Sequence, residues 1–362
     1  MPILETENVE KHFSRRRSVL DMLMRRHNDP VQAVDGVSLS IGENQVQGII
    51  GESGCGKTTL MKLLLGLEDP TGGTIRFRGE GVSEYDRHEW KDFRRNVQVI
   101  LQDPFNSLDP KMTVEKSLKT TLDVHDMGNQ DERIHSTLES VELRPPERYL
   151  DSFPDQLSGG EKQRVSIARA LILEPEVILA DEPVSMLDVS TQAVILNLLS
   201  ELIEEKDLSM MYISHDLSTV SYVCDWINVM YLGRIVETAP TRQLLADPKH
   251  PYSEELLKAV PHLDPHDDRK RTELVGSTPD PIGIGEGCRF RERCPERMDI
   301  CEVTPESVSV GEDRYVACHL HYDHEAVGTE RVPTDGTAAS VGRADGGSAA
   351  PADGEPEEVD QE

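Results

Sequence analysis

The stretch Val46-Gln-Gly-Ile-Ile50-Gly51-Glu-Ser-Gly-Cys-Gly-Lys57-Thr58 decides the fold of this chain. Residues 46–50 have the composition of a short buried strand, and residues 58–67 have the apolar spacing of a helix. Between them, residues 51–58 match the pattern G-x-x-x-x-G-K-[ST], a turn whose backbone N–H groups point at phosphate. A strand, such a loop and a helix in succession predict a phosphate-binding loop in an α/β domain.

The residue types in this loop suit a nucleotide. The amino end of the helix that follows adds a partial positive charge to the backbone N–H groups. We expect Lys57 to bridge the β- and γ-phosphates of ATP, and the Thr58 hydroxyl to ligate Mg²⁺. The residues expected to bind the nucleotide here are Gly51, Glu52, Ser53, Gly54, Cys55, Gly56, Lys57, Thr58 and Thr59.

A second nucleotide element is the run Val177-Ile-Leu-Ala-Asp181-Glu182. A buried strand here delivers two carboxylates at its carboxyl end. Downstream of a phosphate loop, Asp181 is expected to hold the Mg²⁺ shell, and Glu182 to polarise the attacking water as general base. The sequence therefore predicts ATP hydrolysis as well as ATP binding.

The chain divides into three parts that differ in composition and in secondary-structure pattern. Residues 1–240 alternate strand-like and helix-like patterns, which predicts an α/β layered ATPase domain. Residues 241–325 carry short helices broken by proline and then a cysteine-bearing loop region, and residues 326–362 are a Gly, Ala, Pro, Asp and Glu tail that we expect to be disordered. The further predicted helices are 112–124, 130–143, 158–173 and 193–205, and the further predicted strands are 177–180, 210–214 and 226–231.

The charge balance limits the partners. Asp and Glu total 67 against 38 Lys and Arg, so the net charge is −29 and bulk charge gives no attraction to nucleic acid. The tail from Asp323 has 11 acidic and 2 basic residues, a net −9, which leaves −20 on the rest. A carboxylate-rich, lysine-poor surface predicts a cytosol with molar salt, where charge repulsion is screened. With no secretory leader and no membrane-length apolar run, a cytoplasmic protein is expected.

A third motif, Leu157-Ser-Gly-Gly-Glu-Lys-Gln-Arg164, opens a predicted helix. It resembles the signature motif of ATP-binding-cassette (ABC) ATPases. The resemblance implies a RecA-like P-loop ATPase domain with antiparallel β and helical signature subdomains. It also implies that Ser158, Gly159 and Gly160 face the ATP of a partner subunit, so that each site is shared across a dimer.

Other family elements follow in order. Gln102 matches the glutamine that contacts Mg²⁺ and senses the transporter, and His215 matches the switch histidine that orients the γ-phosphate and water. Asp188, in Ser185-Met-Leu-Asp, matches the dimer-contact loop, and Phe13 matches the aromatic that stacks on adenine. Two departures are mild: Met186 stands where the family has Ala, and Thr58 where this subfamily mostly has Ser.

The likeness extends past the ATPase core. The stretches at 101–110, 187–193 and 250–261 resemble the oligopeptide/dipeptide importer subfamily. Its ATPases pair with a related, usually distinct, second ATPase and drive two membrane permeases fed by an extracytoplasmic solute-binding protein. This implies a peripheral subunit on the cytoplasmic face of the membrane that powers peptide uptake. A soluble ABC ATPase not coupled to transport is the alternative.

Four late cysteines, Cys288, Cys294, Cys301 and Cys318, resemble the cluster of the same extension, which can hold a [4Fe-4S] centre. Four-cysteine zinc and unligated thiols are the alternatives. Separately, a basic insert flanks an apolar run in this acidic chain. We expect a solvated insertion, with contact to anionic lipid as the alternative. Its basic residues are Arg15, Arg16, Arg17, Arg25 and Arg26.

Overall fold

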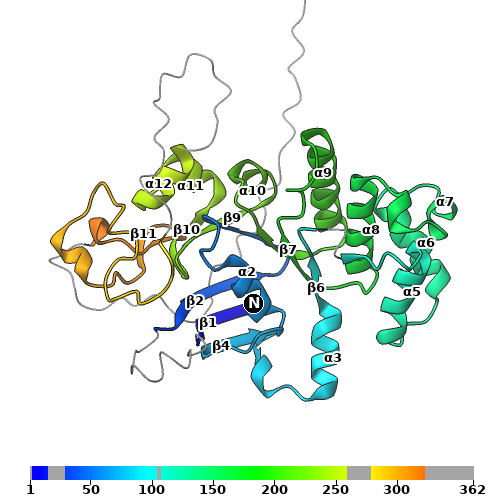
Figure 1. The fold of residues 1–362 in the computed structure, drawn as a ribbon, viewed down its shortest axis with the longest axis horizontal. Coiled ribbons are helices and arrows are strands. Elements are labelled where there is room, and N and C mark those ends of the chain that lie inside the picture. Colours follow the sequence, from blue (N-terminus) through cyan, green and yellow to red (C-terminus); the bar gives the residue numbers. More distant parts are fainter. Residues whose placement is uncertain (1, 15–28, 104–106, 259–278, 323–362) are drawn as a thin grey trace, which may run out of the picture.

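The computed structural model describes residues 2–14, 29–103, 107–258 and 279–322 (Figure 1). The predicted basic insert at 15–26 and the predicted acidic tail at 326–362 lie outside the described residues. Residues 104–106 of the 101–110 motif also lie outside them.

The larger sheet carries the nucleotide elements. Its strand order is β11-β12-β10-β9-β3-β8-β7-β6, and the five strands from β9 to β6 are parallel. The strands are β3 (Val46–Ile50), β6 (Val97–Ile100), β7 (Val177–Asp181), β8 (Ser209–Ile213), β9 (Trp226–Tyr231), β10 (Arg234–Pro240), β11 (Val308–Gly311) and β12 (Arg314–Val316).

The cysteine-bearing C-terminal part continues this sheet. Strand β12 pairs antiparallel with β10, with Glu237 opposite Val316, and β11 pairs antiparallel with β12. Figure 1 shows β11 and β12 at the end of the sheet opposite β6. The short helices here are α11 (Thr241–Ala246), α12 (Pro251–Lys258), η3 (Asp299–Glu302) and η4 (His319–His321).

A smaller antiparallel sheet lies below the first in Figure 1, with the order β2-β1-β4-β5. The strands are β1 (Pro2–Phe13), β2 (Val31–Gly42), β4 (Gly72–Phe77) and β5 (Glu80–Gly81), and the 3₁₀ turn η1 (Val82–Glu84) follows. Helix α2 (Lys57–Leu64) lies between the two sheets, and its buried apolar side chains belong to the same cluster as β1, β2 and β4. This places the phosphate loop where the two sheets meet.

The remaining helices gather on the right in Figure 1 and above the larger sheet. Local capping explains several of their starts. Ser158 begins α8 and Asp86 begins α3 with reciprocal capping boxes, and the Thr113 hydroxyl caps α5. These helices and turns are α3 (Arg87–Asn96), α5 (Val114–Val124), α6 (Gln130–Ser140), α7 (Glu147–Leu150), η2 (Pro154–Gln156), α8 (Gly159–Leu171), α9 (Val189–Glu205) and α10 (Leu217–Val223).

Two apolar clusters hold the layers together on opposite faces of the parallel sheet. Along β7, Ile178 and Ala180 pack with α8 and α9, whereas Val177 and Leu179 pack with α2 and the smaller sheet. This alternation is what a strand buried on both faces requires. The predicted α/β class with antiparallel and helical parts and a cysteine-bearing extension is confirmed.

The predicted boundaries differ from the observed ones by at most three residues, except at one helix start. Helix α9 begins at Val189 rather than at Ala193 because the Asp188 carboxylate caps it, accepting a hydrogen bond from the Thr191 N–H at 3.0 Å. In the part of the chain that the structure describes, no helix has the length and apolar character needed to cross a bilayer.

Candidate active site

The candidate site forms at the carboxyl ends of the parallel strands, where their following loops meet. The phosphate loop follows β3, and Asp181 ends β7. Gln102 follows β6 and His215 follows β8, which is paired with β3 and β7 on its two sides. Four segments distant in sequence therefore deliver polar side chains to one edge of the sheet.

The phosphate loop has a backbone that only glycine adopts freely. Gly54 has φ +80°, and Gly56 has φ +112° with the Ala33 carbonyl oxygen where a Cβ would lie, 2.1 Å away. The buried Lys57 ammonium donates to the carbonyl oxygens of Gly51 at 2.6 Å and Glu52 at 3.0 Å. Lys57 is thus held inside the loop, where it can meet phosphate oxygens.

Thr58 and Asp181 form an oxygen pair beside the loop. The Thr58 hydroxyl donates to an Asp181 carboxylate oxygen at 3.5 Å. Burial and the neighbouring Glu182 charge raise the pKa of Asp181, while Lys57 and Thr58 act in the opposite direction. Carboxylate and hydroxyl oxygens are the ligands that Mg²⁺ prefers, so this donor set fits the metal of MgATP.

Glu182 lies at the centre of a hydrogen-bonded group. Its carboxylate accepts from the Gln102 amide at 2.7 Å, and its other oxygen lies 2.7 Å from Nδ1 of His215. Its backbone has φ +45°, a left-handed conformation that is uncommon for a non-glycine residue and frequent at functional sites. The Glu182 side chain is 14% exposed, so this carboxylate is fixed in orientation and still reachable.

The signature segment is built as a helix start. The Ser158 hydroxyl accepts from the Glu161 N–H at 3.3 Å, and the Glu161 carboxylate accepts from the Ser158 N–H at 2.8 Å. These bonds lower the pKa of Glu161. A Cβ on Gly160 would lie 2.8 Å from the Thr191 side chain, which shows how closely α8 and α9 approach. Among the described residues, no hydrogen bond joins Ser158–Gly160 to the phosphate loop of the same chain.

The loop before α9 presents apolar surface beside Asp188. Met186 is 62% exposed and Val189 is 81% exposed. Hydrogen bonds from Ser190 and Thr191 hold the pKa of Asp188 well below its usual range, so this carboxylate stays charged. Phe13, at the end of β1, is 37% exposed, with the Lys11 ammonium 5.1 Å from its ring centroid.

Sequence reasoning missed several contacts of this site. The Ser185 hydroxyl accepts from Gln102 at 3.3 Å. Glu52 is contacted by Tyr252 and Arg293, which lie beyond the ATPase core. No spacing rule relates residues 200 and 241 positions apart, so only the folded chain reveals these pairs.

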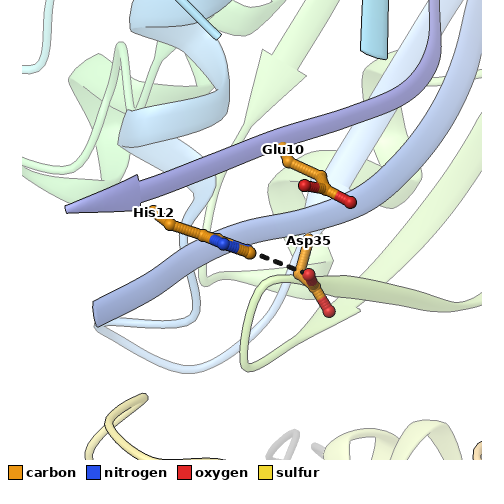
Figure 2. Close-up of side chains that lie close together, drawn as sticks. All are labelled: Glu10, His12 and Asp35. Carbon is orange, nitrogen blue, oxygen red and sulfur yellow. Dashed lines mark hydrogen bonds and ion pairs between the residues drawn. The ribbon is translucent and has the colours of Figure 1, made fainter. Parts of the chain in front are cut away.

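A group outside this site has the composition of a metal centre. Glu10, His12 and Asp35 have ligand atoms within 4.8 Å of one another (Figure 2). Asp35, however, accepts from both Arg234 and Arg289 and from His12, with the His12 nitrogen 3.0 Å away. Burial alone raises the pKa of Asp35, but these cations lower it overall. Two guanidinium groups already neutralise the carboxylate, so we assign it a structural role.

The fold and this site define an ATPase of the ABC cassette class. Residues 34–185 match the family model described as ABC transporter, and residues 236–301 match the one for the oligopeptide/dipeptide transporter C-terminal region. Two relatives span nearly the whole chain. The oligopeptide transport ATP-binding protein AppF of Bacillus subtilis is 41% identical, covering 88% of this chain and 97% of its own length. The dipeptide transport ATP-binding protein DppF of Escherichia coli is 38% identical, covering 88% and 94%.

A solved structure supports the same class. The dimeric, post-hydrolysis state of the ATP-binding cassette MJ0796, bound to ADP and Pi, has a TM-score of 0.56 and 27% identity, covering 66% of this chain and 99% of that one. The chain therefore belongs to the oligopeptide/dipeptide group of ABC transporter ATP-binding proteins. It is an ATPase and the ATP-binding subunit of an importer with membrane permease partners, and the alternative of a soluble ATPase uncoupled from transport is not supported.

The predicted iron–sulfur centre is wrong. In the described part of the chain, only Glu10, His12 and Asp35 gather as a group of three or more possible ligands within 4.8 Å, and the four cysteines do not. All four are free thiols. Burial raises the pKa of Cys288, and it raises the pKa of Cys294 and of Cys318 to about 11 each, which favours thiols over the thiolates that bind metal. The relatives are named as ATP-binding proteins, without a cluster.

Proposed function

We propose that this subunit binds MgATP at residues 51–59 and hydrolyses it with Glu182 as general base. The observation that carries the proposal is the Glu182 carboxylate, fixed between the Gln102 amide and the His215 ring at 2.7 Å from each. A carboxylate so held is ready to accept a proton from water, and His215 fixes its orientation. Phe13 supplies an exposed ring for the adenine.

The proposed metal ligands are Thr58, Asp181 and Gln102. The first two are already joined by a hydrogen bond, and Gln102 joins the group through Glu182. When bound, Mg²⁺ neutralises charge on the phosphate oxygens. The raised pKa of Asp181 means that this ligand takes up a proton, and so loses its charge, at a higher pH than an exposed aspartate.

We propose that each complete site is shared with a partner ATPase. Ser158–Gly160 form the capped amino end of α8, which among the described residues makes no hydrogen bond to the phosphate loop of its own chain and can bind an anion from outside. The exposed Met186 and Val189 beside Asp188 supply apolar surface for such a contact. The partner in this proposal is a distinct paralogue.

The cargo and the setting follow from the family. We propose that the subunit sits on the cytoplasmic face of the membrane, where it powers two permeases fed by an extracytoplasmic solute-binding protein. AppF and DppF are named for oligopeptide and dipeptide transport, which favours short peptides as the cargo. In this proposal, residues 1–240 form the ATPase domain and 241–325 the importer extension.

The test is reconstitution of the complete importer in liposomes, with labelled dipeptide and MgATP. We expect uptake that needs the binding protein and is lost when Lys57→Ala is introduced in this subunit. Uptake that persists with Lys57→Ala would contradict the proposed ATP site. Uptake of another solute class, with no peptide uptake, would contradict the proposed cargo.

A further inference from the structure

The loop at 288–294 carries two arginines that are buried against the ATPase domain. The side chains of Arg289 and Arg293 are 6% and 7% exposed, which is unusual for arginine unless it is paired. Arg289 reaches Asp35 and also donates to Gln32 at 2.7 Å. Four residues later, Arg293 reaches the phosphate loop itself.

Arg293 forms a two-pronged ion pair with Glu52, the second residue of the phosphate loop. Its two terminal nitrogens donate to the two carboxylate oxygens at 2.7 and 2.9 Å. The Glu52 side chain is only 19% exposed, so this pair has little competition from water. Paired forks of this kind fix geometry as well as charge, which a single contact cannot do.

A second contact holds the backbone of the same residue. The Glu52 N–H donates to the Tyr252 hydroxyl at 2.9 Å. Tyr252 belongs to α12, is fully buried, and packs against Tyr231 and Phe290 with ring centroids 4.6 and 5.4 Å away. Both the side chain and the backbone of Glu52 are therefore held by residues C-terminal to the ATPase core.

The extension also contacts the strand edge beside the proposed adenine contact. Ile282 forms a bridge with Val31, and the Gln32 N–H donates to the Pro281 carbonyl at 2.9 Å. Val31 is paired with Phe13 across the β1–β2 ladder. The extension is thus attached to the ATPase domain at two separate places, at Val31 and Gln32 and at Glu52.

The position of Glu52 explains why this matters for phosphate. Its carbonyl oxygen accepts from Lys57, so the residue borders the group that meets the phosphates. The negative charge of a carboxylate at this place repels a triphosphate, and little water is available to screen it. Arg293 removes that repulsion and fixes the second position of the loop at the same time.

We propose that Arg293 and Tyr252 are positioning residues for the phosphate loop, so that the C-terminal extension is a working part of the nucleotide site. The inference rests on the proposed role of residues 51–59 in binding the nucleotide. It adds that nucleotide affinity is set in part by an ion pair between segments 241 residues apart. Neither residue touches the reacting atoms.

The test is a double-mutant cycle on the full-length chain, with the affinity of this chain for MgADP measured by calorimetry and the KM for MgATP measured by turnover of the assembled ATPase pair. We expect Arg293→Gln to weaken MgADP binding and raise KM by about tenfold, with kcat changed by less than about twofold. In a Glu52→Gln background, the same substitution is expected to cost less than about threefold, because the carboxylate that Arg293 pairs with is absent.

Two further variants serve as a matched control and as a conservative substitution. Arg297 lies in the same extension, is 46% exposed and pairs with Glu292 and Glu302, so Arg297→Gln is the matched control and is expected to bind as wild type. Arg293→Lys keeps the charge but loses the fork, and we expect about threefold weaker binding. It serves as the test if Arg293→Gln fails to fold.

The outcomes separate the two proposals. The inference is overturned if Arg293→Gln binds MgADP with wild-type affinity while Lys57→Ala still abolishes binding. If Arg293→Gln fails to fold, the same criterion applies to Arg293→Lys. The inference is also overturned if Arg293→Gln reduces the affinity for MgADP equally in the wild-type and Glu52→Gln backgrounds. That result would indicate that Arg293 acts only on the stability of the fold. Wild-type binding by Lys57→Ala overturns the proposed nucleotide site instead.

Discussion

At the residue scale, the proposed metal site requires a hydroxyl group at position 58. It donates to Asp181, and in the proposed function it ligates Mg²⁺. Serine keeps this hydroxyl and valine keeps the shape without it. The pair of variants Thr58→Ser and Thr58→Val therefore separates chemistry from packing.

We expect Thr58→Ser to retain Mg²⁺-dependent ATP binding within about threefold of wild type, and Thr58→Val to lose at least about tenfold. The measurement is nucleotide affinity titrated against Mg²⁺, with a Mg²⁺-free sample as the baseline. Equal affinities for the two variants would remove Thr58 from the metal site.

Single residues also show how far the sequence can be read. The phosphate loop is contiguous, so its residues were predictable from one motif. Gln102, Glu182 and His215 come from three segments, and their order in the family pattern predicted their meeting. The Arg293–Glu52 pair was not predictable, because it depends on how an irregular loop folds back over the core. The cysteine spacing suggested a metal cluster that the structure does not support.

At the element scale, helix α8 combines a structural and a functional role at one residue. The Ser158 hydroxyl caps the helix, and the same hydroxyl is proposed to face the ATP of the partner. Asp86 caps α3 with the same reciprocal arrangement but lies outside the signature. Asp86→Ala is therefore a matched control for the loss of a cap.

We expect Ser158→Ala and Asp86→Ala each to lower the free energy of unfolding by about 1 kcal/mol. Only Ser158→Ala is expected to slow turnover in the assembled ATPase pair, while ATP binding to the isolated subunit stays unchanged. Denaturant unfolding and steady-state turnover are the measurements. An equal loss of turnover in both variants would mean that the cap acts only through stability.

The start of α12 has an acid-sensitive cap. His250 is fully buried, its Nδ1 accepts from the Tyr252 N–H at 3.0 Å, and burial followed by the charge of His321 lowers its pKa to about 3. The unfolded chain binds a proton here near pH 6.5 and the folded chain does so only near pH 3. Stability contributed at neutral pH is therefore lost as the pH falls from about 6.5 towards 3.

We expect His250→Asn to keep a cap acceptor but remove this titration. Between pH 7 and pH 5, wild type should lose up to about 2 kcal/mol more of unfolding free energy than the variant. Denaturant unfolding at the two pH values measures the difference. Identical pH dependence would show that the pKa of His250 is the same in the folded and unfolded chains, which contradicts the lowered pKa.

At the element scale, the sequence located four of the five parallel strands of the described sheet, β3, β7, β8 and β9, and five helices, α2, α5, α6, α8 and α9, because their apolar periods are strong. The start of α9 was missed because the capping role of Asp188 outweighs the polar residues that follow it. The addition of β11 and β12 to the main sheet was also beyond sequence reasoning, since two short strands give too little pattern to assign an edge.

For the whole molecule, the net charge of −29 sets the response to salt. Self-repulsion between carboxylates opposes folding and is screened as the Debye length falls from about 10 Å at 0.1 M to about 3 Å at 1 M salt. We expect the melting temperature to rise by several degrees over this range of KCl. A chain ending at Tyr322 has nine fewer net negative charges, so its melting temperature should rise less over the same range of KCl. Equal melting temperatures at both salt concentrations would contradict the argument.

The whole assembly is where the site becomes complete, because the signature of one ATPase is proposed to close over the nucleotide of the other. The most direct test is the turnover of the assembled ATPase pair in which this subunit carries Glu182→Gln, together with its affinity for MgATP. Glutamine keeps the shape and the contacts to Gln102 and His215 but cannot accept the proton. We predict affinity within about threefold of wild type and turnover at this site at least about 100-fold slower. Near-normal turnover with normal affinity would contradict the account.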